Sequence, residues 1–422
     1  MATTYATQML SALENGKIEE SNRLFTLSIQ HDSNEVLYAL AEELYGLGFN
    51  DKTKRIYEKI LKSDPNNDQV KVDLANLAID EDDFNEAITY LDQVSEKSDV
   101  YLQSLLVSAD LYESEQLYEV SEQKLLKAYK LAPNEDIIVF ALAELYYTIA
   151  NYRKAVSYYL ILIKKGIDKF SNVNLLSRIG ISYANFGHLE QALGYLEQIN
   201  EHDQTAEVLF QLGFINYQLK DFSKANHYFN ELYKLDNSFS SMYSYWIKSL
   251  MQDNDLNRAY QLLQEALSID EYNDNLYLIA TEVTQRLNKL SETEKYFKKG
   301  LSIFPDNLNL LFNYSNFLKH NHKYQDVIDL LNHYVEDNQI IDPQIYWDLA
   351  NAYQNLEELD KANENYQNAE AGLEDNIDFL KDEFYFYRYK GDKNKTIEIG
   401  DKYLKLNPND EEISMILNDN MS

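Results

Sequence analysis

Cysteine is absent from this chain of 422 residues, and tryptophan, proline and glycine are scarce, with 2, 5 and 12 residues. A chain without cysteine has no disulfide framework and no thiolate metal site, which fits a reducing compartment. The sequence also lacks a Gly-rich phosphate loop and a Gly-x-Ser-x-Gly nucleophile elbow. The residue patterns from which the common enzyme chemistries start are therefore missing.

Long apolar runs are missing as well. The longest, such as residues 137–143 and 158–163, are far shorter than the roughly 20 residues that a membrane-spanning helix needs. Residues 1–15 show no basic start followed by an apolar stretch, so no secretory signal is visible. We therefore expect a cytoplasmic protein.

Positive charge is in short supply. The chain has 38 Lys and Arg residues against 70 Asp and Glu, a formal net charge of −32. Binding to nucleic acid depends on neutralising phosphates, and anionic membrane surfaces attract basic segments, so this balance argues against both partners. The charge is uneven: residues 64–122 hold 16 acids and 2 bases, and residues 123–180 hold 4 acids and 9 bases. Basic partners are favoured.

What the sequence does contain is a period. Pro65 and Pro133 lie 68 residues apart, Pro133 and Pro305 lie 172 apart, and Pro305 and Pro408 lie 103 apart, all close to multiples of 34. The fifth proline, Pro343, falls in an expected first helical turn, where its missing N–H costs nothing. A period of this length indicates a stacked array of helical hairpins, and such an array suggests binding rather than chemistry.

Two further markers share this period, and together with the first-helix pattern they predict helix–turn–helix units. The first helix repeats a large apolar residue, a small residue and a Tyr three positions later, as in Leu142-Ala143-x-x-Tyr146. Spacings of i, i+3, i+4 and i+7 dominate, and strand-like alternation is absent. Small residues recur inside the second helix at Ala87, Ala155, Ala192, Ala225, Ala259 and Ala362. A large residue stands three positions earlier, at Phe84, Tyr118, Tyr152, Leu189, Phe222, Leu256, Leu290, Tyr324 and Leu359.

This pattern resembles the tetratricopeptide repeat (TPR) family. The resemblance implies an all-α, right-handed α-solenoid of about twelve helical hairpins, with the first helices on the concave side and a C-terminal capping helix. Residues 1–33 would form a degenerate N-terminal repeat, 34–408 the solenoid and 409–422 the cap. Units would begin near residues 34, 68, 102, 136, 173, 206, 240, 274, 308, 343 and 377. The unit near 377 departs most from the family pattern, because Glu383 and Phe384 stand where a large apolar and a small residue belong.

The family register places a set of first-helix residues on the concave face. We expect this lining to be acidic at first, then aromatic, then rich in amides, which suits a basic, partly apolar protein segment. For Phe210, Phe214 and Tyr217, packing between hairpins is an equally good reading. The lining residues are Glu42, Asp73, Asp80, Asp110, Glu113, Glu144, Arg178, Phe210, Phe214, Tyr217, Tyr245, Lys248, Asn316, Trp347, Asp348 and Asn351.

The leading hypothesis is a non-enzymatic adaptor that binds other proteins or peptides in the concave groove. Some TPR proteins grip acidic chaperone tails with Lys, Arg and Asn, but the matching slots here hold Tyr38/Glu42, Val72/Asn76 and Leu106/Asp110, so such a tail is not the expected ligand. With its frequent Asn, Tyr, Ile and Lys, its length and no fused domain, the chain resembles the stand-alone TPR proteins of low-GC Gram-positive bacteria (YpiA-like).

Two alternatives remain open. The first is a signal-peptide-responsive TPR regulator that sequesters an effector, although such regulators normally carry an N-terminal module and repeat-like sequence here begins at residue 34 or earlier. The second is an enzyme with a cryptic site, for which His320 and His322 are the nearest candidates. They fall in an expected turn without a third fixed ligand, so a solvated turn is the better reading. We expect no catalytic residues, metal or cofactor, and the partner and oligomeric state are left open.

Overall fold

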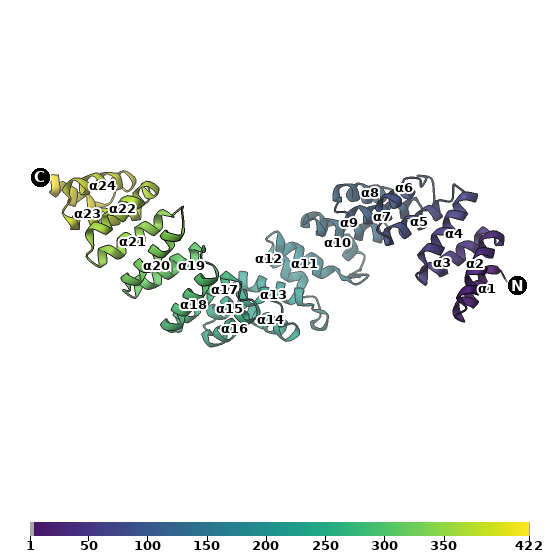
Figure 1. Cartoon of the computed structure of the whole chain (residues 1–422), viewed down its shortest axis with the longest axis horizontal. Helices are drawn as coiled ribbons and strands as arrows, with labels where there is room; N and C mark the ends of the chain where they lie inside the picture. Colours follow the sequence, from purple (N-terminus) through teal and green to yellow (C-terminus); the bar gives the residue numbers. More distant parts are fainter. Residues whose placement is uncertain (1–3, 422) are drawn as a thin grey trace. The chain divides into compact units, whose positions relative to one another are not determined.

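The structure is a computed structural model that describes residues 4–421. Residues 1–3 and 422, which belong to the expected end segments 1–33 and 409–422, lie outside the described part. The described chain is almost entirely helical (Figure 1). It divides into two compact units, Met1–Leu219 and Lys220–Ser422. Between residues 4 and 421, no helix combines the length and the apolar character needed to cross a membrane.

The first unit contains paired helices and one short strand pair. Its elements are α1 (Tyr5–Glu14), α2 (Ile18–His31), α3 (Asn34–Gly46), α4 (Asn50–Ser63), α5 (Asp68–Asp80), α6 (Phe84–Leu91), α7 (Tyr101–Ser114), α8 (Tyr118–Leu131), α9 (Asp136–Thr148), α10 (Tyr152–Lys164), β1 (Lys169–Phe170), β2 (Val173–Asn174), α11 (Leu175–Asn185), α12 (Leu189–Leu196), the 3₁₀ turn η1 (Glu201–Asp203) and α13 (Ala206–Gln218).

The second unit is described by helices alone. Its elements are α14 (Phe222–Leu235), α15 (Ser241–Gln252), α16 (Leu256–Ile269), α17 (Asp274–Arg286), α18 (Leu290–Ile303), α19 (Leu308–His320), α20 (Tyr324–Asp337), α21 (Pro343–Asn355), α22 (Leu359–Leu373), α23 (Ile377–Lys390), α24 (Lys393–Leu406) and α25 (Glu411–Met421).

The turn inside each hairpin has the same backbone conformation. One turn residue adopts the left-handed conformation, and the next helix begins shortly after it. Asp83 and Asp255 cap the helices that follow, because their carboxylates accept hydrogen bonds from the backbone N–H of Glu86 and Arg258. Most successive left-handed residues lie 34 positions apart, so the period of the sequence is the period of the turns. They are Gly16, Gly48, Asp82, Gln116, Ala150, Gly187, Lys220, Asn254, Asn288, His322, Glu357 and Gly391.

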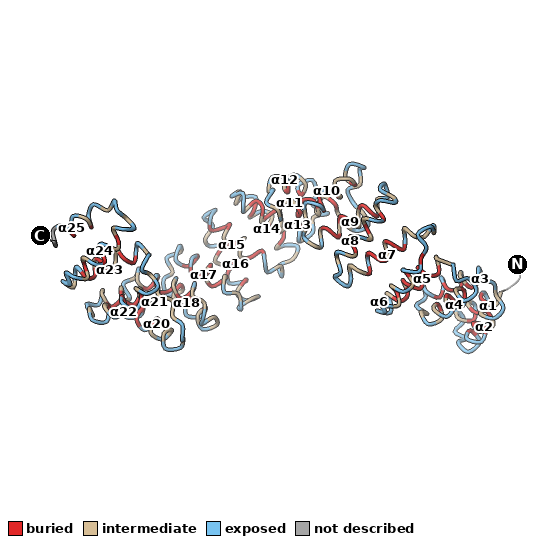
Figure 2. Tube along the Cα trace, turned by 90° about the horizontal axis from the view of Figure 1, so that it is seen from above, coloured by how far each residue is buried: buried red, intermediate tan, exposed pale blue. Residues whose placement is uncertain are grey.

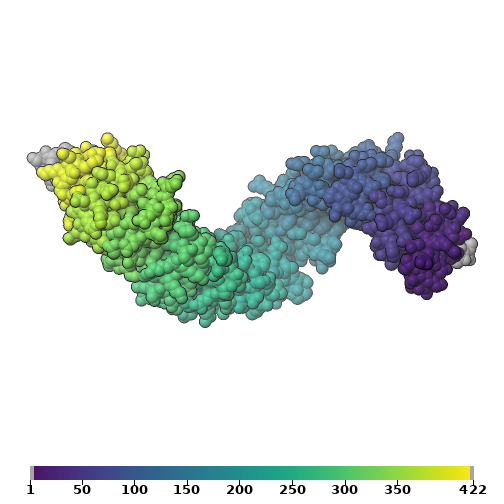
Figure 3. All heavy atoms as spheres, in the orientation of Figure 1, coloured from purple at the N-terminus to yellow at the C-terminus, as the bar shows by residue number. Residues whose placement is uncertain are grey.

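Small residues allow the two helices of a hairpin to approach. In the hairpin of α9 and α10, Leu142, Ala143, Ala155 and Tyr159 are all fully buried. Buried stretches lie in every hairpin and exposed residues mark the turns (Figure 2). Side chains fill the spaces between neighbouring ribbons within each unit (Figure 3). The predicted all-α array of helical hairpins is confirmed, whereas the division into individual repeats stays a prediction.

The last helix covers the end of the second unit. On α25, Ile413 and Leu417 are buried. Leu417 lies over Gly400 of α24, where an added Cβ would come within 2.8 Å of the Leu417 side chain. The helix therefore packs its apolar face on the preceding hairpin, as the end of a repeat array requires.

One element was not expected from the sequence. Between α10 and α11 the chain forms a short antiparallel strand pair, in which Lys169 pairs with Asn174 and Phe170 with Val173. Strands of two residues are too short to show a period, so the alternation on which a strand prediction rests could not appear. The Phe170 ring stacks on Phe140 of α9, with 4.5 Å between the ring centroids.

Candidate functional site

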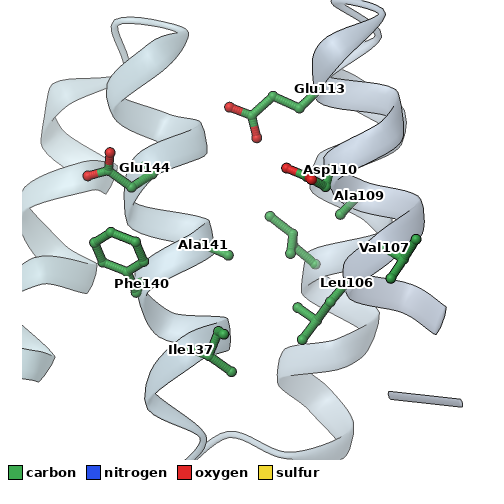
Figure 4. Close-up of a pocket in the computed structure, with 10 residues that line it drawn as sticks. Leu106, Val107, Ala109, Asp110, Glu113, Ile137, Phe140, Ala141 and Glu144 are labelled. Carbon is green, nitrogen blue, oxygen red and sulfur yellow. The ribbon is translucent and has the colours of Figure 1, made fainter. Parts of the chain in front are cut away.

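A pocket of about 400 Å³ lies between α7 and α9 in the first unit. Its walls are apolar and include Leu106 from α7 and Ile137 and Phe140 from α9, and its upper end carries carboxylates. Figure 4 shows Asp110 and Glu113 extending from α7 toward α9. The site thus combines an apolar wall with an acidic rim formed by Asp110, Glu113 and Glu144. Both are built from the first helices of neighbouring hairpins.

The same two acids line a second pocket of about 390 Å³, to which Ile79 of α5 and Thr148 of α9 also contribute. Asp110 is exposed and Glu113 is half-buried. They lie three residues apart on α7 and therefore on one face of the helix. A ligand that crosses α7 would meet both carboxylates.

The rim has strong negative character. Burial raises the pKa of the Glu113 carboxyl, and the charges of Asp110 and Glu144 raise this pKa further, while a hydrogen bond with Thr148 opposes the shift. Among the described residues, no Lys or Arg forms an ion pair with Asp110 or Glu113. The rim therefore favours either a proton or an added cation.

The third acid of the rim, Glu144, already has a cation. Arg178 of α11 binds it with both arms, with 3.2 Å between Nε and Oε1 and 3.1 Å between Nη2 and Oε2. The guanidinium carbon lies 4.3 Å from the centroid of the Tyr147 ring, and the Tyr159 hydroxyl also donates to Glu144. A two-pronged pair beside an aromatic face is the strongest way in which a side chain holds guanidinium.

Further predicted acids in this unit have only neutral donors. Asp73 of α5 accepts hydrogen bonds from the Tyr38 hydroxyl at 2.7 Å and from Gln69 Nε2 at 3.0 Å. Burial raises the pKa of the Asp73 carboxyl, although these two donors lower it. Asp80 accepts a hydrogen bond from Tyr45, and Glu42 of α3 is exposed. The acidic lining predicted for this part of the chain lies on consecutive first helices.

The predicted aromatic residues lie on α13. Phe210, Phe214 and Tyr217 are half-buried, and the first two rings stack with 6.0 Å between their centroids. All three residues make further interactions within the chain. Packing and partner binding both remain open for them, so their assignment to the site stays a prediction.

In the second unit, two predicted residues of α21 point their donors at one carboxylate of α23. Trp347 Nε1 donates to Asp382 of α23 at 3.1 Å, and Asn351 Nδ2 lies 3.5 Å from the same carboxylate oxygen. Burial raises the pKa of the Asp382 carboxyl, and the two donors oppose this. Asn316 of α19 is exposed, and Tyr245 and Lys248 of α15 are half-buried.

Asp348 is only 2% exposed and has three donors of its own. They are Ser315 Oγ at 2.7 Å, Lys319 Nζ at 2.8 Å and Gln344 Nε2 at 3.0 Å. The Asp348 carboxylate is therefore part of the packing between α19 and α21.

Sequence reasoning missed the apolar wall of the first pocket. Phe140 and Ile137 precede Glu144 by four and seven residues, so they share its helix face. That spacing would have revealed them. Sequence reasoning also missed Asp382, although this residue lies 34 positions after Asp348, which is the period of the repeat.

The two candidate histidines lie at the turn between α19 and α20. His322 Nδ1 lies 3.2 Å from the Tyr324 hydroxyl. Within residues 4–421 no group of three or more His, Cys, Asp or Glu side chains is placed to hold a metal ion.

Family models match four parts of the chain. Models described as "YpiA-like, C-terminal tetratricopeptide repeats" and "YpiA-like, tetratricopeptide repeats" match residues 343–410 and 114–167. General tetratricopeptide repeat models match residues 44–106 and 206–239. The chain is therefore a member of the tetratricopeptide repeat family.

More narrowly, it is a YpiA-like tetratricopeptide repeat protein. The TPR repeat-containing protein YpiA of Bacillus subtilis (strain 168) is 28% identical over 412 residues, which cover 97% of this chain and 96% of that protein. Repeats of this class form protein–protein interaction scaffolds, and their proteins bind other proteins or peptides.

Matches among solved structures include the following two. A tetratricopeptide repeat protein from Parabacteroides merdae is 13% identical, with a TM-score of 0.42, and the match covers 60% of this chain and 98% of that chain. The APC/C hetero-tetramer Cut9–Hcn1 is also 13% identical, with a TM-score of 0.35, and the match covers 99% of this chain and 96% of that chain.

Proposed function

We propose that the chain is a non-enzymatic, cytoplasmic adaptor that binds a basic, partly apolar segment of another protein along α5, α7 and α9. The observation that carries this proposal is the pocket between α7 and α9, whose apolar wall meets two carboxylates that form no ion pair with any Lys or Arg in the described part of the chain. The net charge of −32 adds long-range attraction for a basic partner.

The two parts of the pocket would do different work. Apolar side chains of the partner would lose water against Leu106 and Ile137, which stabilises the complex by about 25 cal/mol per Å² buried. A Lys or Arg of the partner would pair with Asp110 and Glu113 in a partly desolvated setting, where such hydrogen bonds contribute about 1.5–3 kcal/mol each.

The test compares two variants that change the net charge equally. Asp110→Asn with Glu113→Gln neutralises the rim, and Asp99→Asn with Glu119→Gln neutralises two exposed acids elsewhere. Binding would be measured by fluorescence anisotropy with three labelled peptides of equal length: basic–apolar, acidic–apolar and neutral. We expect the wild type to prefer the basic–apolar peptide and the rim variant to bind it at least about tenfold more weakly, because the local charge pairs are lost.

The control variant should bind nearly as the wild type does, apart from a small change that salt abolishes. Equal weakening in both variants, or equal binding of acidic and basic peptides, would contradict the proposal. Small-angle scattering on the bound and free protein separates the regulator alternative, for which marked compaction on peptide binding is expected.

A further inference from the structure

Neighbouring repeats provide an internal comparison for the pocket. The small residue of the first-helix pattern is Ala143 in α9 and Gly180 in α11. Two positions earlier, α9 has Ala141 and α11 has Arg178. These two residues therefore occupy the same place in successive repeats.

The same comparison applies to the acid that faces this place. Glu144 directly follows Ala143 on α9, and Asp110 directly follows the buried Ala109 on α7. We call the contact between the first helices of two neighbouring hairpins a step. The Glu144–Arg178 pair in the step from α9 to α11 thus corresponds to Asp110 and Ala141 in the step from α7 to α9.

The structure differs between the two steps as this correspondence predicts. Between α9 and α11, the guanidinium of Arg178 fills the space in front of Glu144. Between α7 and α9, the side chain of Ala141 ends at its methyl group, and both Ala141 and Asp110 line the pocket of about 400 Å³ (Figure 4). The pocket therefore corresponds in position to the space that the Arg178 guanidinium fills one repeat later.

We propose that this pocket takes an arginine side chain from the partner segment, with its guanidinium on Asp110 and Glu113 and its methylene stem against Leu106 and Ile137. This inference rests on the proposed function and specifies the residue type that the α7–α9 step recognises. The partner arginine would reproduce in trans the contact that Arg178 makes within the chain.

Several features favour arginine over lysine. Two carboxylates one helical turn apart match the planar fork of guanidinium, which presents five donors in fixed directions, better than the single point charge of an ammonium. Phe140 adds an aromatic wall, and the stacked ring of Phe170 holds it in place. Guanidinium is also more weakly hydrated and loses less on entering a half-buried site.

The pKa of the Glu113 carboxyl gives the inference a second measurable consequence. The Glu113 carboxyl faces Asp110 on its own helix and Glu144 and Thr148 on α9, and burial raises its pKa. An arriving cation would favour the charged carboxylate, so binding should lower the pKa of Glu113.

The experiment uses the full chain with labelled Leu and Ile methyl groups and three acetylated, amidated peptides. These peptides have the sequence Leu-Xaa-Leu, where Xaa is arginine, lysine or citrulline, the neutral isostere of arginine. We expect saturable NMR shifts of the Leu106 and Ile137 methyl signals with the arginine peptide, weaker binding with lysine, and binding at least about tenfold weaker with citrulline. An NMR titration of the Glu113 side chain against pH should show a lower pKa with the arginine peptide bound than without it.

A variant closes the pocket from within. Ala141→Arg supplies the chain with its own guanidinium opposite Asp110, and should reduce binding of the arginine peptide at least about tenfold. Ala141→Gln adds a stem without charge and should reduce it less.

Equal affinity for the arginine and citrulline peptides would overturn the inference whether or not the variants fold. So would unchanged binding in a folded Ala141→Arg protein. If basic peptides still bind in a way that depends on Asp110 and Glu113, the proposed function survives such a result. If no basic peptide binds the wild type, both proposals fail.

Discussion

Glu383 is a fully buried carboxyl group on α23, and neither of its oxygens has a hydrogen-bond partner among the described residues. Burial, and after it the charge of Glu370 on α22, raise its pKa from the ordinary value of 4.5 to about 8. Lys395 and Lys402 on α24 act in the opposite direction. The packed hairpin therefore holds this side chain as a neutral acid at physiological pH.

The direction of the pH effect follows from linkage. Because the pKa is raised on folding, the folded state keeps a proton that the unfolded chain releases above pH 4.5. The contribution of Glu383 to stability is therefore fully present below pH 4.5 and falls as the pH rises toward 8. A tenfold difference in proton affinity between the folded and unfolded states corresponds to about 1.36 kcal/mol, so the free energy of unfolding should fall by about 3–4 kcal/mol between pH 5 and pH 8.

Replacing Glu383 with Gln removes this titration while keeping the size of the side chain. We expect Glu383→Gln to change stability little at pH 5, where the acid is neutral in the native state, and to stabilise the protein by about 3–4 kcal/mol at pH 8. Glu398→Gln on α24 is the matched control, because it removes the same charge from an exposed residue that pairs with Lys402 at 3.2 Å. Exposed pairs of this kind contribute about 0–1 kcal/mol.

Hydrogen exchange measured by mass spectrometry suits a repeat array, in which each hairpin contacts only its neighbours and opens separately. After correction for the intrinsic pH dependence of exchange, protection of α23 and α24 in the wild type should fall by about two to three orders of magnitude from pH 5 to pH 8. Helices α3 and α4 serve as an internal reference. Parallel pH profiles for the wild type and Glu383→Gln would refute the reasoning, since they would mean that Glu383 does not titrate on unfolding.

Two packing predictions complete the set. Gly180→Ala should destabilise the protein by about 1–3 kcal/mol, because an added Cβ would lie 2.5 Å from Leu196 Cγ. The loss should appear as a lower midpoint of thermal unfolding. In the control, Gly194→Ala, the added Cβ meets no atom within 4 Å, so this variant should be neutral or stabilised by up to about 1 kcal/mol. Leu417→Ala, at a residue 2% exposed, should cost about 2–5 kcal/mol and reduce hydrogen-exchange protection in α24, whereas Met415→Ala, at a residue 66% exposed, should change stability by less than about 0.5 kcal/mol. Equal effects of the members of either pair would contradict the packing described.

The hairpin fold was predictable because its signals are set by packing and repeat at every unit. A residue such as Ala143 must be small where two helices touch, and Tyr146 must lie three positions later to reach the preceding hairpin, where its hydroxyl donates to Glu122 of α8. Such constraints recur at fixed spacing and can be recognised from one sequence. Glu383 could be noticed in the same way, since it breaks the pattern at a position that the structure shows to be buried.

The partners of individual side chains could not be predicted. Glu144 and Asp110 hold the same place in successive repeats, yet one is paired with Arg178 and the other is not. The difference depends on which side chain the next helix presents across the gap, and the period does not fix the lateral offset of two helices. The strand pair that includes Phe170 was missed for a related reason, because a contact as local as this has no repeat.

Carboxylates on the first helices of the hairpins differ in whether donors of the chain hold them, and this difference decides where a partner is expected to bind. In the second unit, Asp348 and Asp382 are held by donors from the chain itself. A ligand there would have to displace existing hydrogen bonds, and every donor left unpaired in the process would cost about 1–3 kcal/mol. On α7, Asp110 and Glu113 offer acceptors that no Lys or Arg within residues 4–418 occupies, and burial already destabilises the charge on Glu113. A cation from a partner would pair at this point without displacing a Lys or Arg among the described residues, so the region between α7 and α9 is where the sequence of a partner should matter most.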